Sequence, residues 1–400
     1  MHATAVLIPY FLRYRLCLHV FMHDIQAAVT FQRRPLMLLS ELNFCFPASR
    51  DLWRAPSAET WRARYLSKES PYAGPWPRAL PKIAGMLHSL AVVEETIGMV
   101  DSDLCYSVYL HGVGGIIASL DRDYDSNNGG DPSSPVWEEQ KQSIYQSLCN
   151  LTADVCFPEY DFTMIAELYK MMTHVSLSDL QGFAGKHGIV RSWRACQTFS
   201  KLWVPTSQAR RAVSHAGQVL YCARRMAPGS IRGFNAVALY FASLTLCVYF
   251  RLYDQAPHTH PGHAYHINLR PVVVLDTEEM TGIGAFVSSD RGVPALSVGG
   301  MLPNATTIMN IAVKRLRDNV ADSRDPTPPL VQSLINLMQA MGEGAGVCLD
   351  KALWKEFPCP ARKPDGRYTR RPSGPGRQPL EEDGDDWAQY FLPLDPYPLL

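Results

Sequence analysis

Apolar side chains recur every three or four residues over most of this 400-residue chain, which is the spacing of one face of an α-helix. The clearest series is Phe162, Ile165, Leu168, Tyr169, Met172 and Val175. The same spacing predicts further helices at about residues 7–30, 83–100, 101–120, 137–151, 195–203, 209–226, 234–252 and 330–341. The pattern therefore predicts an all-α fold, a large domain of many helices.

Proline, glycine and short polar residues mark where these helices should end. Pro35 closes the first helix, because a proline disfavours helix at the residue before it. Residues 121–135 have few apolar side chains and predict a loop, and Gly342 stands where a helix often takes a C-cap glycine. The run from Val272 to Leu275 is typical of a strand, but it is isolated and does not predict a sheet.

The segment after Pro35 is rich in proline and carries three tryptophans. Trp53, Trp61 and Trp76 are expected to pin this stretch onto the body of the protein, because a buried aromatic ring contributes a large apolar area.

The composition changes near Lys355, where arginine, lysine, proline and glycine replace most apolar residues. Such a segment buries too little surface to offset its chain entropy, so we expect a disordered tail. The tail ends in an acidic run at residues 381–386 followed by Trp387, Tyr390, Phe391 and Leu392, a composition that also occurs in disordered activation segments. The predicted organisation is a helical domain over 1–350 and a tail over 351–400.

The overall charge argues against direct binding of nucleic acid by this chain. It has 38 basic and 38 acidic residues and a pI of about 7.2, whereas nucleic-acid-binding domains usually have a basic excess. Its ten cysteines are scattered singly, with no pair at the spacing that clamps a zinc ion. Cys17, Cys196, Cys222 and Cys247 lie in apolar helical runs and are expected to be small, reduced core residues.

Two apolar segments need to be distinguished from membrane or export signals. Residues 3–22 carry Arg13 and Arg15 in their middle, whereas a secretory signal has its charge in front of the apolar run, so no signal peptide is expected. Residues 234–250 are at the lower limit for spanning a bilayer. Asn235, Ser243 and Thr245 interrupt them, which favours a buried core helix.

Four histidines that could chelate a divalent metal lie in one short segment: His258, His260, His263 and His266. Pro257, Pro261 and Gly262 beside them favour a solvated loop. We therefore predict no catalytic, cofactor-binding or metal residue in this chain.

Two glycine-rich motifs also have structural interpretations. Gly112, Gly114 and Gly115 resemble an esterase oxyanion loop, but the chain has no G-x-S-x-G nucleophile motif. These glycines are expected to mark a close approach of two segments. The pair Gly282 and Gly284 lacks the third glycine of a dinucleotide fingerprint, and no phosphate-binding loop occurs.

Several segments together resemble the fungal-specific transcription factor domain, over roughly residues 10–345. The most recognisable runs from His23-Asp24 through Phe31-Gln32-Arg33-Arg34-Pro35 to Leu52-Trp53-Arg54-Ala55 and Trp61. The resemblance continues at Leu168-Tyr169-Lys170, at residues 180–188, at His215-Ala216-Gly217-Gln218-Val219 and at Pro328-Pro329-Leu330-Val331. Lys170 stands where the family pattern would have histidine.

The resemblance implies an all-helical regulatory domain of a nuclear transcription factor that acts on RNA polymerase II genes and that is not an enzyme. In such factors DNA is bound by a zinc finger or zinc cluster in front of this domain, and that module is not among these residues. Zinc and DNA are therefore expected to be bound only by the missing module. The other expected partners are a second copy of the chain, in a homodimer, and transcriptional co-regulators that bind the C-terminal tail. Two other interpretations stay open: a metal-dependent enzyme that uses the histidine loop, and a membrane-associated protein that uses residues 234–250.

Overall fold

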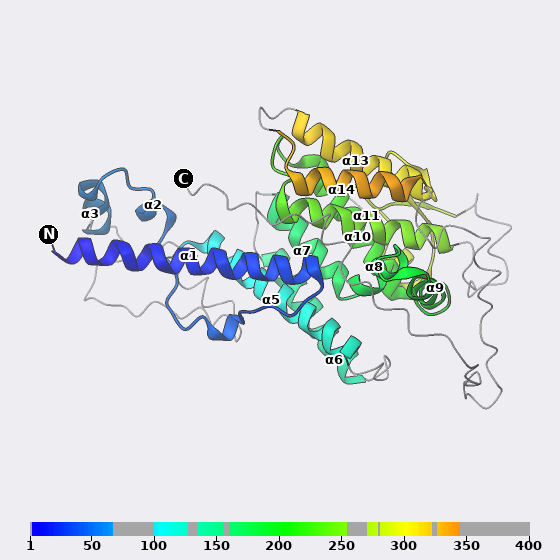
Figure 1. Cartoon of the computed structure of the whole chain (residues 1–400), viewed down its shortest axis with the longest axis horizontal. Coiled ribbons are helices and arrows are strands. Elements are labelled where there is room, and N and C mark those ends of the chain that lie inside the picture. The colour runs from blue at the N-terminus through cyan, green and yellow to red at the C-terminus, as the bar shows by residue number, and fades with distance from the viewer. Residues whose placement is uncertain are drawn as a thin grey trace, which may run out of the picture. The chain divides into compact units, whose positions relative to one another are not determined.

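The chain is an all-α protein with one small sheet, as the helical spacing predicts (Figure 1). The structure is a computed structural model that describes residues 2–66, 100–126, 135–154, 160–253, 270–278, 281–321 and 326–343. The predicted helix at 83–100, apart from Val100, and the tail at 351–400 lie outside these residues. The chain forms two compact units, an N-terminal unit of Met1–Cys156 and a C-terminal unit of Phe157–Leu400.

Two long helices that lie side by side organise the N-terminal unit. Its described elements are α1 (His2–Phe31), η1 (Leu39–Glu41), α2 (Arg50–Trp53), α3 (Ala58–Leu66), α5 (Ser102–Ser126) and α6 (Pro135–Asp154). A Cβ at Gly115 of α5 would lie 2.7 Å from the Cδ1 atom of Ile25 in α1, and one at Gly112 would lie 2.7 Å from Cδ2 of Leu39. The prediction of a close approach is confirmed for Gly112 and Gly115.

A buried ion pair joins the start of α5 to α1. The Arg15 guanidinium donates to Asp101 at 2.8 Å and to the carbonyl oxygen of Ala48 at 3.0 Å. It also lies 4.9 Å from the ring centre of Trp53. Trp53 is 45% exposed, so its predicted role as a buried anchor is wrong, because Leu52 is the residue that α2 turns inward.

The C-terminal unit is built around one helix that is apolar on every side. Its elements before the sheet are α7 (Tyr160–Met172), α8 (Leu177–Phe183), α9 (Gly188–Thr198), η3 (Phe199–Trp203), α10 (Ser207–Arg225) and α11 (Gly233–Tyr253), and those after it are α13 (Ala305–Ala321) and α14 (Pro329–Gly342). Helix α11 contacts α7, α8, α10, α13 and α14. Neighbours on all sides explain why its sequence has no polar face.

By length and composition alone α11 is also able to cross a membrane, and no other helix among the described residues passes that test. Within the C-terminal unit, however, 89% of its apolar window is buried. Ser243 and Thr245 are accommodated because their hydroxyls donate to the carbonyl oxygens of Leu239 and Phe241, at 2.8 and 2.9 Å. Residues 234–250 therefore form the buried core helix that the sequence predicts.

A small three-stranded sheet lies beside α10, and its presence corrects the prediction that the run at Val272 is isolated. Strand β1 (Val272–Val274) pairs in parallel with β2 (Val293–Leu296), which pairs antiparallel with β3 (Gly300–Met301). Helix α12 (Ile283–Ser289) connects the two parallel strands. Strand β2 escaped prediction because its sequence Val-Pro-Ala-Leu is short and contains a proline.

Side chains of α13 form hydrogen bonds with backbone groups at the end of α10 and in the turn between α10 and α11. Arg315 donates to the carbonyl oxygens of Ala223 at 2.5 Å and Met226 at 2.9 Å. Asn319 donates to the carbonyl oxygen of Ala227 and accepts from the backbone N–H of Ile231, both at 2.9 Å. These side chains satisfy backbone groups that the end of a helix leaves without partners.

Three local predictions are corrected by the structure. Helix α5 continues to Ser126, so residues 121–126 are not part of a loop. Gly342 is the last residue of α14 rather than its cap, and a Cβ there would lie 3.3 Å from Cβ of Met309, so this glycine allows α13 and α14 to pack closely. Cys17 is exposed, whereas Cys196, Cys222 and Cys247 are buried as predicted.

Candidate functional site

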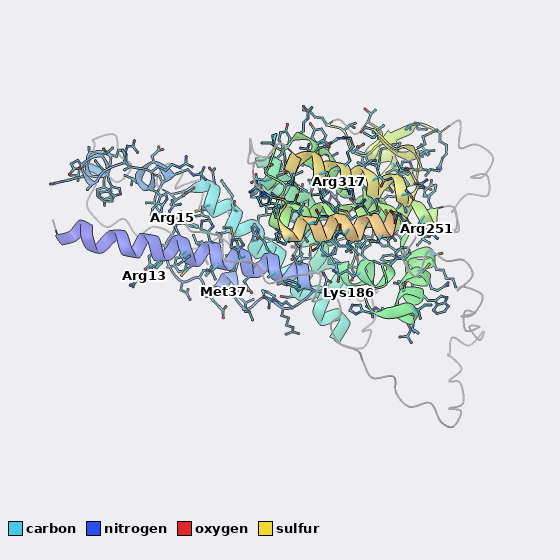
Figure 2. The ribbon with its side chains drawn as sticks, turned by 45° about the horizontal axis from the view of Figure 1, so that its top comes forward. Arg13, Arg15, Met37, Lys186, Arg251 and Arg317 are labelled. Carbon is cyan, nitrogen blue, oxygen red and sulfur yellow. The ribbon has the colours of Figure 1, made fainter. Side chains whose placement is uncertain are left out.

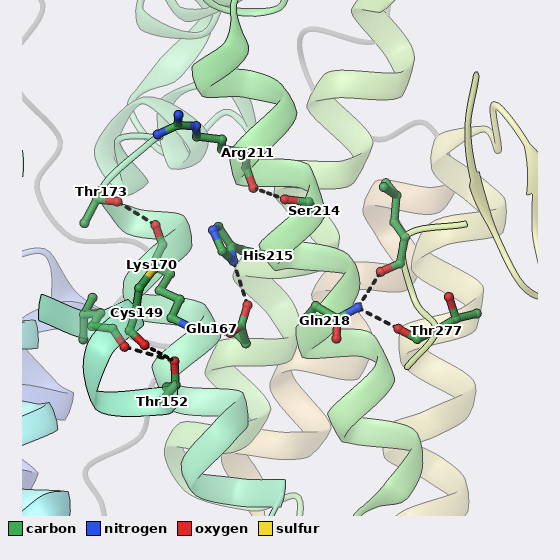
Figure 3. A network of polar contacts seen from close by, with 12 residues as sticks. Cys149, Thr152, Glu167, Lys170, Thr173, Arg211, Ser214, His215, Gln218 and Thr277 are labelled. Carbon is green, nitrogen blue, oxygen red and sulfur yellow. Dashed lines mark hydrogen bonds and ion pairs between the residues drawn. The ribbon is translucent and has the colours of Figure 1, made fainter. Parts of the chain in front are cut away.

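A buried cluster of charged side chains joins α7 to α10, and we call it the α7–α10 latch (Figure 3). The carboxylate of Glu167 accepts from Nζ of Lys170 at 2.9 Å, and its second oxygen bonds to Nδ1 of His215 at 2.7 Å. Glu167 and Lys170 lie one turn apart on α7, and His215 comes from α10. The side chains of these three residues are between 8% and 13% exposed. One glutamate thus bridges a lysine of its own helix and a histidine of α10 inside the unit.

The surroundings of Glu167 strongly favour its ionised form. Burial by itself would raise the pKa of this carboxyl group, but the charges and hydrogen bonds of His215 and Lys170 outweigh burial and lower its pKa from 4.5 to about 2. The carboxylate is therefore retained well into the acid range. Because the partners come from two helices, the ion pairs also fix how α10 sits against α7.

The lowered pKa predicts an acid-dependent contribution to stability. A carboxylate whose pKa falls from 4.5 to about 2 on folding stabilises the folded state above pH 4.5, and this stabilisation is lost as the pH falls toward 2. Its size is about 3 kcal/mol. We expect the difference in unfolding free energy between the wild type and Glu167→Gln, measured with urea, to shrink by about this amount between pH 5 and pH 2. A difference that does not change with pH would contradict the charged state of the latch.

Aromatic and amide side chains extend the latch at the end of α7. The ring of His174 stacks on that of His215 with 5.9 Å between the ring centres. Its Nδ1 atom bonds to Oε1 of Gln208 at 2.5 Å, and its carbonyl oxygen accepts from the indole N–H of Trp203 at 2.9 Å. The turn after α7 is thereby fixed to η3 and to the first turn of α10.

The next turn of α10 holds the sheet. Gln218 donates to the carbonyl oxygens of Leu275 at 3.0 Å and Thr277 at 2.9 Å (Figure 3). Gly217 lets the backbone of Leu275 approach so closely that a Cβ at this position would lie 2.6 Å from the Leu275 Cβ. Residues 215–218 of α10 therefore contact α7 on one side and the end of β1 on the other.

A second buried carboxylate completes this junction. Asp276 is 1% exposed and accepts from Arg224 of α10 at 2.6 Å. It also accepts from the backbone N–H of Ser297 at 2.7 Å and from the hydroxyl of Ser297 at 2.8 Å. Arg224 donates in addition to the carbonyl oxygen of Asp276. The sheet and α10 thus share charged as well as backbone hydrogen bonds.

The contacts between α7, α10 and the sheet are suited to holding these elements in a fixed register. Among the described residues no group of three His, Cys, Asp or Glu side chains is placed to hold a metal ion. The histidines at 258–266 lie outside the described residues. Comparison with protein-family models, with curated proteins and with solved structures gave no match for this chain.

Four of the segments that carry the family resemblance lie in the C-terminal unit. Leu168-Tyr169-Lys170 lies on α7 directly after Glu167, and residues 215–219 lie on α10 opposite it. Residues 180–188 form the end of α8 and the turn into α9, and Pro328 caps α14. Two of these segments therefore meet at the α7–α10 latch.

Sequence reasoning missed Glu167, His174 and Asp276 as partners in this junction. One signal was available for the first, because Glu167 and Lys170 are charged residues in a helix that is otherwise mostly apolar. Charges this deep are rare unless they are paired. The identity of the partner was not accessible, since His215 is 48 residues away along the chain.

Proposed function

We propose that this chain is the regulatory domain of a fungal transcription factor that acts on RNA polymerase II genes in the nucleus and that is not an enzyme. The zinc-dependent module that recognises DNA lies outside these 400 residues in this proposal. DNA contact, and zinc as a cofactor, then belong to that module. Residues 381–392 bind transcriptional co-regulators, and the domain is able to form a homodimer.

The observation that carries this proposal is the junction at the α7–α10 latch. Two segments of the resemblance, 168–170 and 215–219, lie next to each other there, joined through Glu167. Their polar side chains bond to helices and to the sheet, as Lys170 does to Glu167 and Gln218 does to Leu275. Residues that are used to join structural elements fit a regulatory domain that keeps several helices in register.

The proposal is tested with a reporter gene in a yeast host. The full chain is fused to a heterologous DNA-binding domain, and expression is measured against that DNA-binding domain alone. We expect expression above this reference, and its loss in the variant with Trp387, Tyr390 and Phe391 replaced by alanine, because aromatics beside acidic residues supply the anchors of activation segments.

A matched control comes from the same tail. Replacing Trp354 and Phe357 with alanine removes two aromatics that lie before the acidic run, and this variant should keep its activity. Equal expression from the fusion and from the DNA-binding domain alone would sink the proposal. Stoichiometric zinc in the purified chain, lost when the four histidines at 258–266 are replaced, would favour the metal-dependent enzyme instead.

A further inference from the structure

The charges of the C-terminal unit are distributed very unevenly along the chain. Between Asp179 and Asp254 there are ten lysines and arginines and no aspartate or glutamate, although the whole chain is neutral. Some of these cations are used inside the unit, as Arg210 and Arg224 are. Arg191 of α9 pairs with Asp179, and Arg194 and Lys201 are exposed on α9 and η3.

The exposed residues of α9 and η3 form a single line along one side of this helical segment. Val190, Arg194, Thr198, Lys201 and Leu202 follow each other at helical spacing and are all exposed. The opposite side, with Ser192, Ala195, Cys196 and Phe199, is buried. We call the exposed line the basic stripe.

The basic stripe combines cations with apolar ends. Val190 is 49% exposed and Leu202 is 69% exposed, and they are about 18 Å apart at the rise of an α-helix. Arg194 and Lys201 lie between them. Lys186, in the turn just before α9, is half-exposed and donates to Gln181 at 2.7 Å (Figure 2). Such a surface suits an acidic peptide that also carries large apolar side chains.

The chain itself contains a peptide of this composition in its tail. Glu381, Glu382, Asp383, Asp385 and Asp386 supply five carboxylates, and the aromatics Trp387, Tyr390 and Phe391 follow them at spacings of three and four residues. In a helical conformation these three rings would share one face. The peptide therefore matches the stripe in both charge and apolar anchors.

The tail is also long enough to reach this surface. Residues 343–380 lie between the end of α14 and the acidic run, and a random coil of that many residues would have a root-mean-square span of about 34 Å. Helix α14 and the stripe belong to the same compact unit. A tethered peptide is present at an effective concentration in the millimolar range, so even weak intrinsic affinity gives substantial occupancy.

We infer that residues 381–392 bind the basic stripe of α9 and η3 in the same molecule. The carboxylates pair with Arg194 and Lys201, and the aromatic rings cover Val190 and Leu202. This inference goes beyond the proposed function and holds whether or not the chain regulates transcription. Its consequence for a regulator would be that co-regulators compete with the stripe for the tail, so that the full chain activates more weakly than the same tail without the stripe.

Hydrogen exchange of the full chain, followed by mass spectrometry, tests the inference. In the variant E381Q/E382Q/D383N/D385N/D386N the carboxylates become neutral amides of similar shape. We expect amides of residues 188–203 to exchange about tenfold faster than in the wild type, as when a segment docked in roughly nine of ten molecules is released. Residues 305–321 of α13 should be unchanged.

A charge swap adds a test that a general loss of stability could not mimic. In the variant R194E/K201E the amides of residues 188–203 should lose the protection that the bound tail gives them. Lysines in place of the five tail carboxylates should restore this protection when they are combined with R194E/K201E. The matched control is K314E/R317E, which reverses two exposed charges on α13, on a different part of the unit (Figure 2). It should leave the protection intact.

Three results would overturn the inference. Unchanged exchange at residues 188–203 in the neutral-tail variant would mean that the tail does not cover the stripe, and this variant changes no residue that the structure describes. Protection that falls on dilution would assign the bound tail to a second copy of the chain. An equal loss in K314E/R317E would show that the attraction is not specific to the stripe.

Discussion

Glu167→Ala is expected to lower the free energy of unfolding of the C-terminal unit by about 4 kcal/mol, because it leaves Lys170 and His215 buried without their shared carboxylate. These side chains are 8% and 13% exposed, so water replaces the lost partner poorly. For a domain of this size the loss corresponds to a decrease in Tm of about 8–16 °C. Urea unfolding followed by circular dichroism at pH 7 measures it.

Two comparisons isolate the role of burial. Glu278→Ala removes a carboxylate that is 77% exposed and lies 3.9 Å from Arg225, and it should change stability by less than about 0.5 kcal/mol. The loss of stability in the double variant E167A/K170A should be smaller than the sum of the losses in the two single variants, since the second change removes the buried charge that the first deprived of its carboxylate. Strict additivity would show that the latch is not a coupled network.

Gly217→Ala is expected to destabilise the same unit by about 3 kcal/mol even though alanine is the better helix former. Helix propensity favours alanine by about 1 kcal/mol. The added Cβ, however, overlaps the carbonyl group of Leu275 as well as its Cβ, and a backbone group cannot rotate away as a flexible side chain does. Moving β1 back would lengthen the hydrogen bonds from Gln218, so overpacking outweighs propensity.

Gly284→Ala is the control for this steric effect. Gly284 lies in α12 and has no atom within 4 Å of the position of an added Cβ, so alanine should be neutral there or stabilise by up to about 1 kcal/mol. Thermal unfolding of both variants decides the point. If Gly217→Ala is as stable as Gly284→Ala, the contact between α10 and β1 is looser than the structure shows.

The fold class could be predicted from the sequence because helical periodicity is a local signal. The series through Phe162 and Leu168 and the apolar run from Phe234 each became a helix, α7 and α11. The sheet could not be predicted, since the strand at Val272 depends on a partner that begins at Val293. Pairing between segments leaves no periodic trace in either of them.

Only part of the junction between α7 and α10 could be predicted from the sequence. A resemblance drew attention to Leu168-Tyr169-Lys170 and to residues 215–219, but nothing in the order of the residues indicates that Glu167 joins them. Gly112 could be interpreted correctly because a glycine in a helix signals close packing. Gly342 could not, since a glycine at the end of a helix serves equally well as a cap or as a contact, and its neighbour Met309 is distant in sequence.

The contacts of Arg315 and Asn319 with the end of α10 cannot form until α13 has been synthesised. The carbonyl oxygen of Ala223 is made 92 residues before Arg315, which is on the order of 5–20 s at ordinary translation rates. Helix α11, the most apolar of the helices that the structure describes, is complete once Tyr253 has been added, and it lacks α13 and α14, two of the helices that cover it, until those later residues have been made. The nascent chain therefore presents a strongly hydrophobic segment to chaperones before its own C-terminal helices can shield it.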